Sequence, residues 1–293
     1  ISIFKYFHLY DVMILVKYKN HMIKQAIIPL AGLGTRMLPL TGVIPKELMP
    51  INGKTNLEYI MEECINAGVK KFIFIISKKK ISIKKYFFND KFYINILKKK
   101  KDKRIKKEFL KLKKYQKMIK FVYQNKPKGT GDAVLKCKKY IKEKYFLMLL
   151  PDDLIIKENC SSEMIKLHKK TKGSIIATKR IEKKTASRWG ILSIKNKKKN
   201  HFQIKNVVEK PSVKNAPSNY AIIGRYILPS KIFSEIKKLK PGQGGEIHIT
   251  DAINNLVHKN YKFYGNIFKG KYLDCGTLSG YINSSIQISK GLK

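Results

Sequence analysis

Residues 29–50 read PLAGLGTRMLPLTGVIPKELMP, the most informative stretch of the chain. An apolar, strand-like run leads into a turn that contains Gly32 and Gly34. Glycine has no Cβ, so main-chain N–H groups in such a turn can approach a phosphate closely. Basic residues follow at Arg36 and Lys46, and their charge would help to hold a triphosphate. The stretch therefore predicts a strand that ends in a phosphate-binding loop.

The spacing of this loop excludes two common phosphate-binding motifs. A Walker loop needs GxxxxGK[ST] and a dinucleotide-binding turn needs GxGxxG, and neither fits here. The order G-x-G-T-R followed by P-K instead resembles the loop of the sugar-phosphate nucleotidylyltransferases, and the resemblance extends from about Lys24 to Ser284. It implies one Rossmann-like α/β domain over residues 22–293, with a mixed, mostly parallel central sheet flanked by helices.

Residues 1–21 precede the family-like sequence. They are apolar and aromatic, interrupted by charged residues, and lack the small-residue cleavage site of a signal peptide. We interpret them as an N-terminal extension that is not native, because translation has been assigned upstream of the true start. A functional amphipathic arm is the alternative.

The charge of the chain is strongly positive. Among 293 residues, 63 are Lys or Arg and 20 are Asp or Glu, which gives a formal net charge of +43. Only five of the 63 are arginine, although nucleic-acid readout favours the bidentate fork of arginine. We therefore attribute most of the charge to solvated lysines and expect no specific nucleic-acid partner. A nucleic-acid-binding protein stays as an alternative supported by charge alone.

The four cysteines form no CxxC pair and no zinc spacing with the six histidines. Such isolated thiols are typical of proteins in a reducing compartment, so we expect a cytoplasmic location. No run of apolar residues approaches the length of a transmembrane helix, and we expect no membrane partner.

The order of local patterns predicts a parallel α/β sheet. Thr55–Glu58 reads as a capping box, Gly68 ends the helix that follows, and Phe72–Ile76 is a buried strand. The lysine-rich stretch 98–120 is interpreted as a solvated amphipathic helix. Further strands are predicted at 121–123, 145–150, 175–178, 190–194, 203–208 and 219–228, and further helices after 129–131, at 230–239 and at 249–258.

Two aspartates stand where a divalent metal could bind. Asp152 follows an apolar strand in LLPDD, and Asp274 lies in GKYLDCGT. Carboxylate oxygens suit Mg²⁺, which keeps several waters and takes further ligands from substrate phosphate. In the family, aspartates at these two places bind the ion that bridges the sugar phosphate and the nucleotide. The resemblance therefore implies Mg²⁺ as cofactor, with Asp152 and Asp274 as its ligands.

The family resemblance also implies a sugar-phosphate site. Glu209-Lys210-Pro211 is similar to the V-E-K-P element, in which the glutamate accepts hydrogen bonds from sugar hydroxyls and the lysine binds the phosphate. Gly190 corresponds to a glycine whose backbone borders the sugar. Trp189 replaces a tyrosine that is common beside it.

For the nucleotide, the resemblance implies a second set of residues. Main-chain groups of Ala31 and Gly32 would face uracil, and Gln124 can both donate to and accept from its edge. The remaining predicted nucleotide contacts are Gly34, Thr35, Glu47 and Gly129. Thr250 and Asp251, in a segment similar to G-E-x-x-x-T-D-A, are either helix caps or supports for the site, and we favour capping.

The implied activity is transfer of a uridylyl group from UTP to glucose 1-phosphate, by a homo-oligomer. Mg²⁺ and Lys210 would align the sugar phosphate, while Arg36 and Lys46 would stabilise the departing pyrophosphate. A thymidylyltransferase and a catalytically silent regulatory homologue are the alternatives within this family. The AGLGTR wording and the run through NYAIIGRY favour the uridylyl enzyme, and Asp152, Lys210 and Asp274 argue against the silent one.

Overall fold

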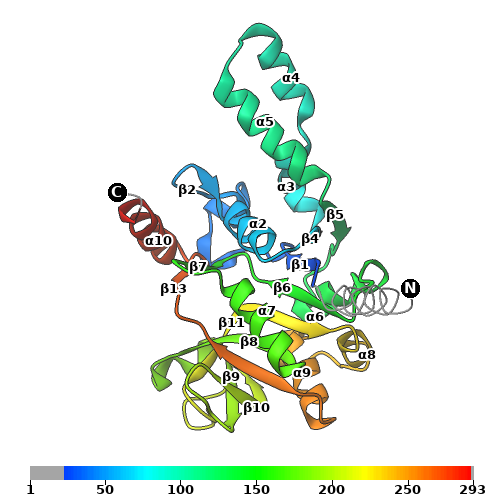
Figure 1. Ribbon diagram of the computed structural model, residues 1–293, viewed down its shortest axis with the longest axis vertical. Coiled ribbons are helices and arrows are strands. Elements are labelled where there is room, and N and C mark those ends of the chain that lie inside the picture. The colour runs from blue at the N-terminus through cyan, green and yellow to red at the C-terminus, as the bar shows by residue number, and fades with distance from the viewer. Residues whose placement is uncertain (1–22, 292–293) are drawn as a thin grey trace, which may run out of the picture.

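The computed structural model describes residues 23–291, in which strands and helices alternate around one large sheet (Figure 1). The predicted N-terminal extension, residues 1–21, lies outside the described residues. None of the helices in the described part is both long enough and apolar enough to cross a membrane.

The central sheet has nine strands in the order β5-β4-β1-β6-β11-β8-β12-β10-β9. In chain order the strands are β1 (Gln25–Pro29), β4 (Lys71–Ile76), β5 (Ile119–Tyr123), β6 (Tyr145–Leu149), β8 (Ser174–Arg180), β9 (Gly190–Lys195), β10 (His201–Glu209), β11 (Tyr220–Pro229) and β12 (Phe263–Ile267). Strands β10 and β11 run opposite to the other seven. The predicted mixed, mostly parallel sheet is therefore confirmed.

Helices cover both faces of this sheet. The helices of the described residues are α2 (Asn56–Asn66), α3 (Ile81–Phe88), α4 (Asp90–Lys99), α5 (Lys103–Gln116), α6 (Gly129–Leu135), α7 (Cys160–Thr171), α8 (Ile232–Ile236), α9 (Ile249–His258) and α10 (Leu278–Lys290), of which α4 and α5 project from the sheet (Figure 1). Neighbouring residues of β1 belong to different cores: Ile28 packs in the core with α2 and α7, and Ile27 in the core with α6, α8 and α9. Apolar side chains on both faces explain why these strands read as continuous apolar runs.

The local signals around α2 are confirmed. The Thr55 side chain accepts from the Glu58 backbone N–H, while the Glu58 carboxylate accepts from the Thr55 N–H, which is the predicted capping box. Gly68 follows the helix with φ +99°, a conformation that favours glycine. This helix carries the chain from β1 and its loop to β4, which pairs parallel with β1.

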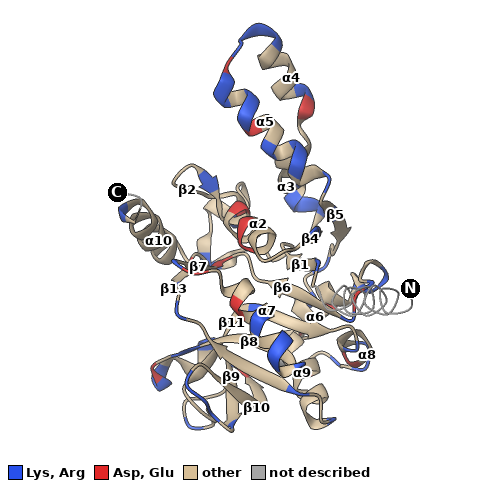
Figure 2. Cartoon of the chain, viewed as in Figure 1, with Lys and Arg blue, Asp and Glu red and all other residues tan. Residues whose placement is uncertain are grey.

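The lysine-rich stretch forms one arm of a helical hairpin that projects from the body (Figure 1). Helix α5 begins at Lys103 rather than at residue 98, because the turn from α4 occupies residues 100–102. Lys and Arg positions recur along the length of the hairpin (Figure 2), while Leu112 and Tyr115 are buried. The predicted solvated amphipathic helix is confirmed, within narrower bounds.

Two small ribbons complete the fold. Strands β2 (Pro50–Ile51) and β3 (Lys54–Thr55) form a hairpin just before α2. Strands β7 (Asp153–Ile156) and β13 (Lys271–Asp274) pair antiparallel, with Asp153 opposite Asp274. The second ribbon was not predicted, and it is the feature that brings Asp274 to the carboxyl end of β6.

Candidate active site

Two cavities lie beside each other at the carboxyl ends of the parallel strands, and they share Leu150 and Asp152. The larger has a volume of about 520 Å³ and the smaller about 240 Å³. Predicted residues that line the larger cavity are Arg36, Asp152, Gly190, Glu209, Lys210 and Asp274. Those that line the smaller one are Ala31, Gly32, Lys46, Glu47, Gln124, Gly129 and Asp152. The predicted sugar-phosphate residues therefore line the larger cavity, most of the predicted nucleotide residues line the smaller one, and the two cavities meet at Asp152. Arg36, predicted to contact the departing pyrophosphate, lines the larger cavity.

The loop after β1 folds through three short 3₁₀ turns, Thr35–Met37, Leu40–Gly42 and Lys46–Leu48. Gly34 has φ +69°, and its carbonyl accepts a hydrogen bond of 2.8 Å from the Thr41 hydroxyl. Gly34 and Thr35 line neither cavity. In this conformation Gly34 shapes the loop, and Ala31 and Gly32 are the part of it that faces the smaller cavity.

Asp152 is held by two cations from this loop. Its Oδ2 lies 2.5 Å from Lys46 Nζ and 3.4 Å from an Arg36 guanidinium nitrogen. Burial favours the neutral forms of Asp152 and Lys46, but their mutual attraction outweighs it, lowering the pKa of Asp152 and raising that of Lys46. Both groups are therefore charged at neutral pH.

Asp274 reaches the same place from β13. Its Oδ1 accepts from the Gly276 N–H at 2.8 Å, and its Oδ2 lies 3.8 Å from an Arg188 nitrogen. A Cβ on Gly276 would lie 2.7 Å from both Asp152 Oδ2 and an Arg36 guanidinium nitrogen, and 3.1 Å from Asp274 Oδ1. The two carboxylates thus converge on one small space that the glycine leaves open.

This space suits a small, hard cation. Among residues 23–291, no three His, Cys, Asp or Glu side chains are arranged to hold a metal ion. Mg²⁺ does not require three, because it is commonly bound by one or two carboxylates together with water and substrate phosphate. The donor chemistry of Asp152 and Asp274 therefore fits Mg²⁺.

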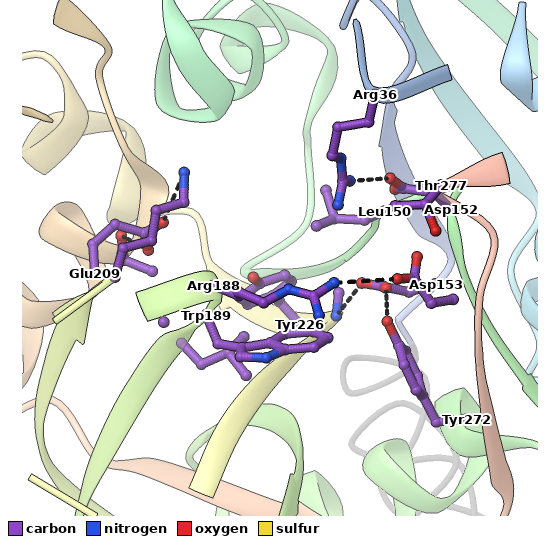
Figure 3. Close-up of a pocket in the computed structure, with 16 residues that line it drawn as sticks. Arg36, Leu150, Asp152, Asp153, Arg188, Trp189, Glu209, Tyr226, Tyr272 and Thr277 are labelled. Carbon is purple, nitrogen blue, oxygen red and sulfur yellow. Dashed lines mark hydrogen bonds and ion pairs between the residues drawn. The ribbon is translucent and has the colours of Figure 1, made fainter. Parts of the chain in front are cut away.

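Asp153 is a half-buried carboxylate that was not among the predicted site residues. It accepts from the Tyr272 hydroxyl at 2.6 Å and from the Gly224 N–H at 3.0 Å (Figure 3). Burial and the neighbouring Asp152 charge raise its pKa to about 6. A Cβ on Gly224 would lie 2.5 Å from Asp153 Oδ2, so only glycine leaves room for this contact.

The predicted sugar-phosphate residues lie across the larger cavity from Asp152 (Figure 3). Gly190 pairs with Glu209 across strands β9 and β10, and the Lys210 N–H donates to the Trp189 carbonyl at 3.0 Å. A Cβ on Gly190 would lie 3.2 Å from Glu209 Oε2. The backbone of β9 thus fixes the position of the Glu-Lys pair.

The prediction that Thr250 caps a helix is wrong. The N-cap residue of α9 is His248, which makes no side-chain capping bond, and the first backbone N–H of the helix, that of Ile249, donates to the Thr130 hydroxyl at 3.3 Å. The Thr250 hydroxyl instead donates to Glu209 Oε2 at 3.0 Å. Thr250 lies on the first turn of α9, which packs against β10, so its hydroxyl faces the strand rather than the helix end.

In the smaller cavity, the side chains have protein partners. The Gln124 amide donates to Asp132 at 2.7 Å and to the Gly129 carbonyl at 3.2 Å. The Glu47 carboxylate is buried and accepts from Lys80 Nζ at 2.7 and 2.8 Å. Glu47 was predicted as a nucleotide contact, and this ion pair instead ties its carboxylate to the turn after β4.

Four further residues of the larger cavity were missed: Arg188, Tyr226, Tyr272 and Thr277. Arg188 extends into the cavity toward Asp274 (Figure 3). The one available signal in the sequence was the scarcity of arginine, because Arg188, which precedes Trp189, is one of only five arginines in the chain.

Comparisons with known proteins agree with this geometry. The nucleotidyl transferase family model matches residues 25–291. A putative UTP–glucose-1-phosphate uridylyltransferase of Methanocaldococcus jannaschii is 38% identical over 91% of this chain and 93% of that protein. The UTP–glucose-1-phosphate uridylyltransferase of Bacillus subtilis is 35% identical over 91% of both chains.

Solved structures give the same result. A UDP-glucose pyrophosphorylase complexed with UDP-glucose has a TM-score of 0.80 at 34% identity, covering 92% of this chain and 100% of that one. A UTP-bound enzyme from Acinetobacter baumannii has a TM-score of 0.77 at 30% identity, covering 91% of this chain and 93% of that one. The chain belongs to the nucleotidyl transferase family.

Proposed function

We propose that this chain transfers the uridylyl group of UTP to glucose 1-phosphate, forming UDP-glucose and pyrophosphate. The observation that carries the proposal is the pair of cavities that meet at Asp152. One is bordered by Ala31 and Gly32 of the β1 loop and the other by the Glu209-Lys210 pair. Relatives named for this activity, 38% and 35% identical over most of the chain, support it.

The proposed reaction is a displacement at the α-phosphorus of UTP. An oxygen of the sugar phosphate forms a bond to this phosphorus, the bond to the β-phosphate oxygen breaks, and pyrophosphate leaves with the negative charge. The attacking phosphate is already ionised at neutral pH, so no side chain has to remove a proton. Positioning and charge stabilisation are therefore the main tasks of the protein.

The cations of the site differ in how firmly they are held. The Lys46 side chain is 13% exposed and held by Asp152, whereas those of Arg36 and Lys210 are 57% and 48% exposed. We assign the sugar phosphate to Lys210, and the departing pyrophosphate to Arg36 and Lys46. The exposed side chains of Arg36 and Lys210 have room to follow the substrate phosphates as these bind.

Mg²⁺ is the proposed cofactor, with Asp152 and Asp274 as the residues that would hold it. When bound, the ion neutralises phosphate oxygens. In the free protein Lys46 and Arg36 contact the Oδ2 of Asp152. The phosphates of UTP would attract both cations and so release this oxygen.

The direct experiment measures pyrophosphate release with Mg²⁺ for each pairing of UTP or dTTP with glucose 1-phosphate, and identifies the nucleotide sugar by mass. We expect turnover with UTP to exceed that with dTTP. A preference for dTTP would reassign the chain to thymidylyl transfer. No turnover with either nucleotide would indicate a silent homologue. Binding of RNA that survives physiological salt would revive the nucleic-acid alternative.

Three statements stay predictions: the homo-oligomeric state, the cytoplasmic location and the domain start at residue 22. Light scattering on the purified protein measures the first of these.

A further inference from the structure

A third cavity, with a volume of about 620 Å³, shares no lining residue with the two catalytic cavities. Its walls come from the β2–β3 hairpin, helix α2, the β7–β13 ribbon and the C-terminal end of α10. Its volume is in the range of cavities that bind small molecules. It is therefore large enough for a ligand and separate from the site described above.

The lining of this cavity is strongly cationic. It contains Lys54, Lys157, Lys271 and Lys290, and among residues 23–291 it contains no carboxylate. Lys54 Nζ is already paired with Glu62 Oε2 at 2.6 Å. Within the described part of the chain, the other three ammonium groups have no carboxylate within 4.0 Å. Three like charges around one cavity repel each other, and a multivalent anion would relieve that repulsion.

The floor of the cavity is apolar. Ile288 of α10 is 5% exposed, and Ile156 at the end of β7 packs against the same core. The Tyr59 ring also lines the cavity, with the Lys54 ammonium 5.5 Å from its centroid. This mixture suits a ligand that has a carbon framework as well as charge, because apolar surface contributes affinity and placed charges contribute orientation.

We propose that this cavity binds a small organic polyphosphate, such as a nucleoside triphosphate or a sugar bisphosphate. Phosphate esters carry two or more charges on adjacent oxygens, which matches ammonium groups gathered from separate segments. A monocarboxylate would leave most of the lysine charge unpaired. A long polyanion would not place its carbon framework against Ile156 and Ile288.

The position of the cavity connects it to the catalytic centre. In the β7–β13 ribbon, Lys271 lies opposite Ile156 at one end, and Asp274 lies opposite Asp153 at the other. The two ends of β13 are three residues apart, about 10 Å in an extended strand. A ligand held by Lys271 would therefore pull on the strand that carries Asp274. This consequence rests on the proposed function, whereas binding itself does not.

The test is calorimetric titration of the intact protein with ATP, fructose 1,6-bisphosphate and inorganic tripolyphosphate, in 0.15 M salt with saturating UDP-glucose. The variant Lys157→Gln/Lys271→Gln removes two cavity charges. The control Lys106→Gln/Lys107→Gln removes two charges from the helical hairpin. We expect at least a tenfold weaker Kd in the cavity variant for ATP or for the bisphosphate, and less than a twofold change in the control.

The outcomes separate the ligand sources and the two proposals. Tight binding of ATP alone assigns a nucleotide, and tight binding of the bisphosphate alone assigns a sugar phosphate. Equal losses in the cavity and control variants, or no binding by the unaltered protein, overturn the proposal. Both variants have the same catalytic cavities, so this comparison holds even if UDP-glucose does not bind.

Emission of Trp189, the single tryptophan, reports on the larger cavity. Binding that leaves this emission unchanged overturns the connection through the ribbon.

Discussion

The two catalytic cavities are lined by different kinds of groups. The smaller one is bordered by glycines of two loops and by side chains that are already held by protein partners, such as Gln124 and Glu47. The larger one is bordered by charged side chains that extend from strand ends, such as Arg188 and Lys210. Backbone shape should therefore govern the nucleotide, and side-chain charge should govern the sugar phosphate.

A buried ion pair joins the two halves. The nucleotide half comprises the elements around the smaller cavity, and the sugar half comprises those around the larger one. Glu63 lies on α2, which follows the β1 loop of the nucleotide half, and Arg225 lies on β11, next to Gly224 of the sugar half. The fully buried Arg225 guanidinium donates to both carboxylate oxygens of Glu63, at 2.9 to 3.2 Å. The comparison can thus be tested at Asp152, which both cavities share, at the Glu63–Arg225 pair, which is the joint, and in each half separately.

The largest effect is expected at the residue that both cavities share. Asp152→Asn removes one carboxylate charge from the proposed metal site and the partner of Lys46, so turnover should fall by about a thousandfold or more. Pyrophosphate release measures turnover, and circular dichroism checks the fold. Asp102→Asn, at the N-cap of α5 far from the cavities, should change neither. Near-native turnover in Asp152→Asn would remove this residue from the site.

A stability effect of similar size is expected at the joint. Glu63→Gln leaves the Arg225 charge buried without its counterion, which should lower the free energy of unfolding by about 3–5 kcal/mol. Urea denaturation measures this change. Glu62→Gln is the matched control, because the neighbouring Glu62–Lys54 pair is partly exposed to solvent, unlike the buried pair, and is worth less than about 1 kcal/mol. Equal losses in the two variants would contradict the role of the buried pair.

A smaller and selective effect is expected from backbone shape. Gly129 has φ +92°, and a Cβ there would lie 2.5 Å from the Ile247 carbonyl oxygen. Gly129→Ala should therefore displace the wall of the nucleotide cavity and raise the KM for UTP about tenfold. Gly68→Ala has a similar φ but meets nothing within 4 Å, so it should leave both KM values unchanged. If both variants leave the KM for UTP unchanged, backbone shape does not govern this half.

The smallest effect is expected from the positioning residue of the sugar half. Thr250→Val removes the hydrogen bond to Glu209, worth about 1 kcal/mol, and should raise the KM for glucose 1-phosphate about fivefold. Thr250→Ser keeps the hydroxyl and should restore the native value. An unchanged KM in Thr250→Val, or no rescue by serine, would show that the hydroxyl does not position Glu209.

The parts of this molecule that could be predicted depend on local sequence. The capping box at Thr55, the strand before the β1 loop and the turn at Gly129 each have a signal within a few residues. The pairing of β7 with β13 has none, because it joins short strands that are more than a hundred residues apart. The Glu63–Arg225 pair, 162 residues apart, and the Glu47–Lys80 pair, 33 residues apart, also have no local signal.

The site was predicted as a list of residues but not as an arrangement. Motif wording identified the Asp152 and Lys210 segments, and the cavities bring most of the predicted residues together. The role of Thr250 depended on which way one helix face turns, which is decided by the packing of α9 on β10. Arg188 and Asp153 became candidates only when the ribbon placed them beside Asp274.

The central claim, that each cavity serves one substrate, is tested most directly by crossed titration of two variants. Lys210→Gln removes a charge from the sugar half, and Gln124→Ala removes an amide from the nucleotide half. We expect Lys210→Gln to raise the KM for glucose 1-phosphate at least tenfold, since a charge-assisted hydrogen bond is worth about 1.5–3 kcal/mol, and to leave the KM for UTP within about twofold. Gln124→Ala should show the reverse pattern with a smaller factor. Equal defects toward both substrates in both variants would contradict the division between the cavities.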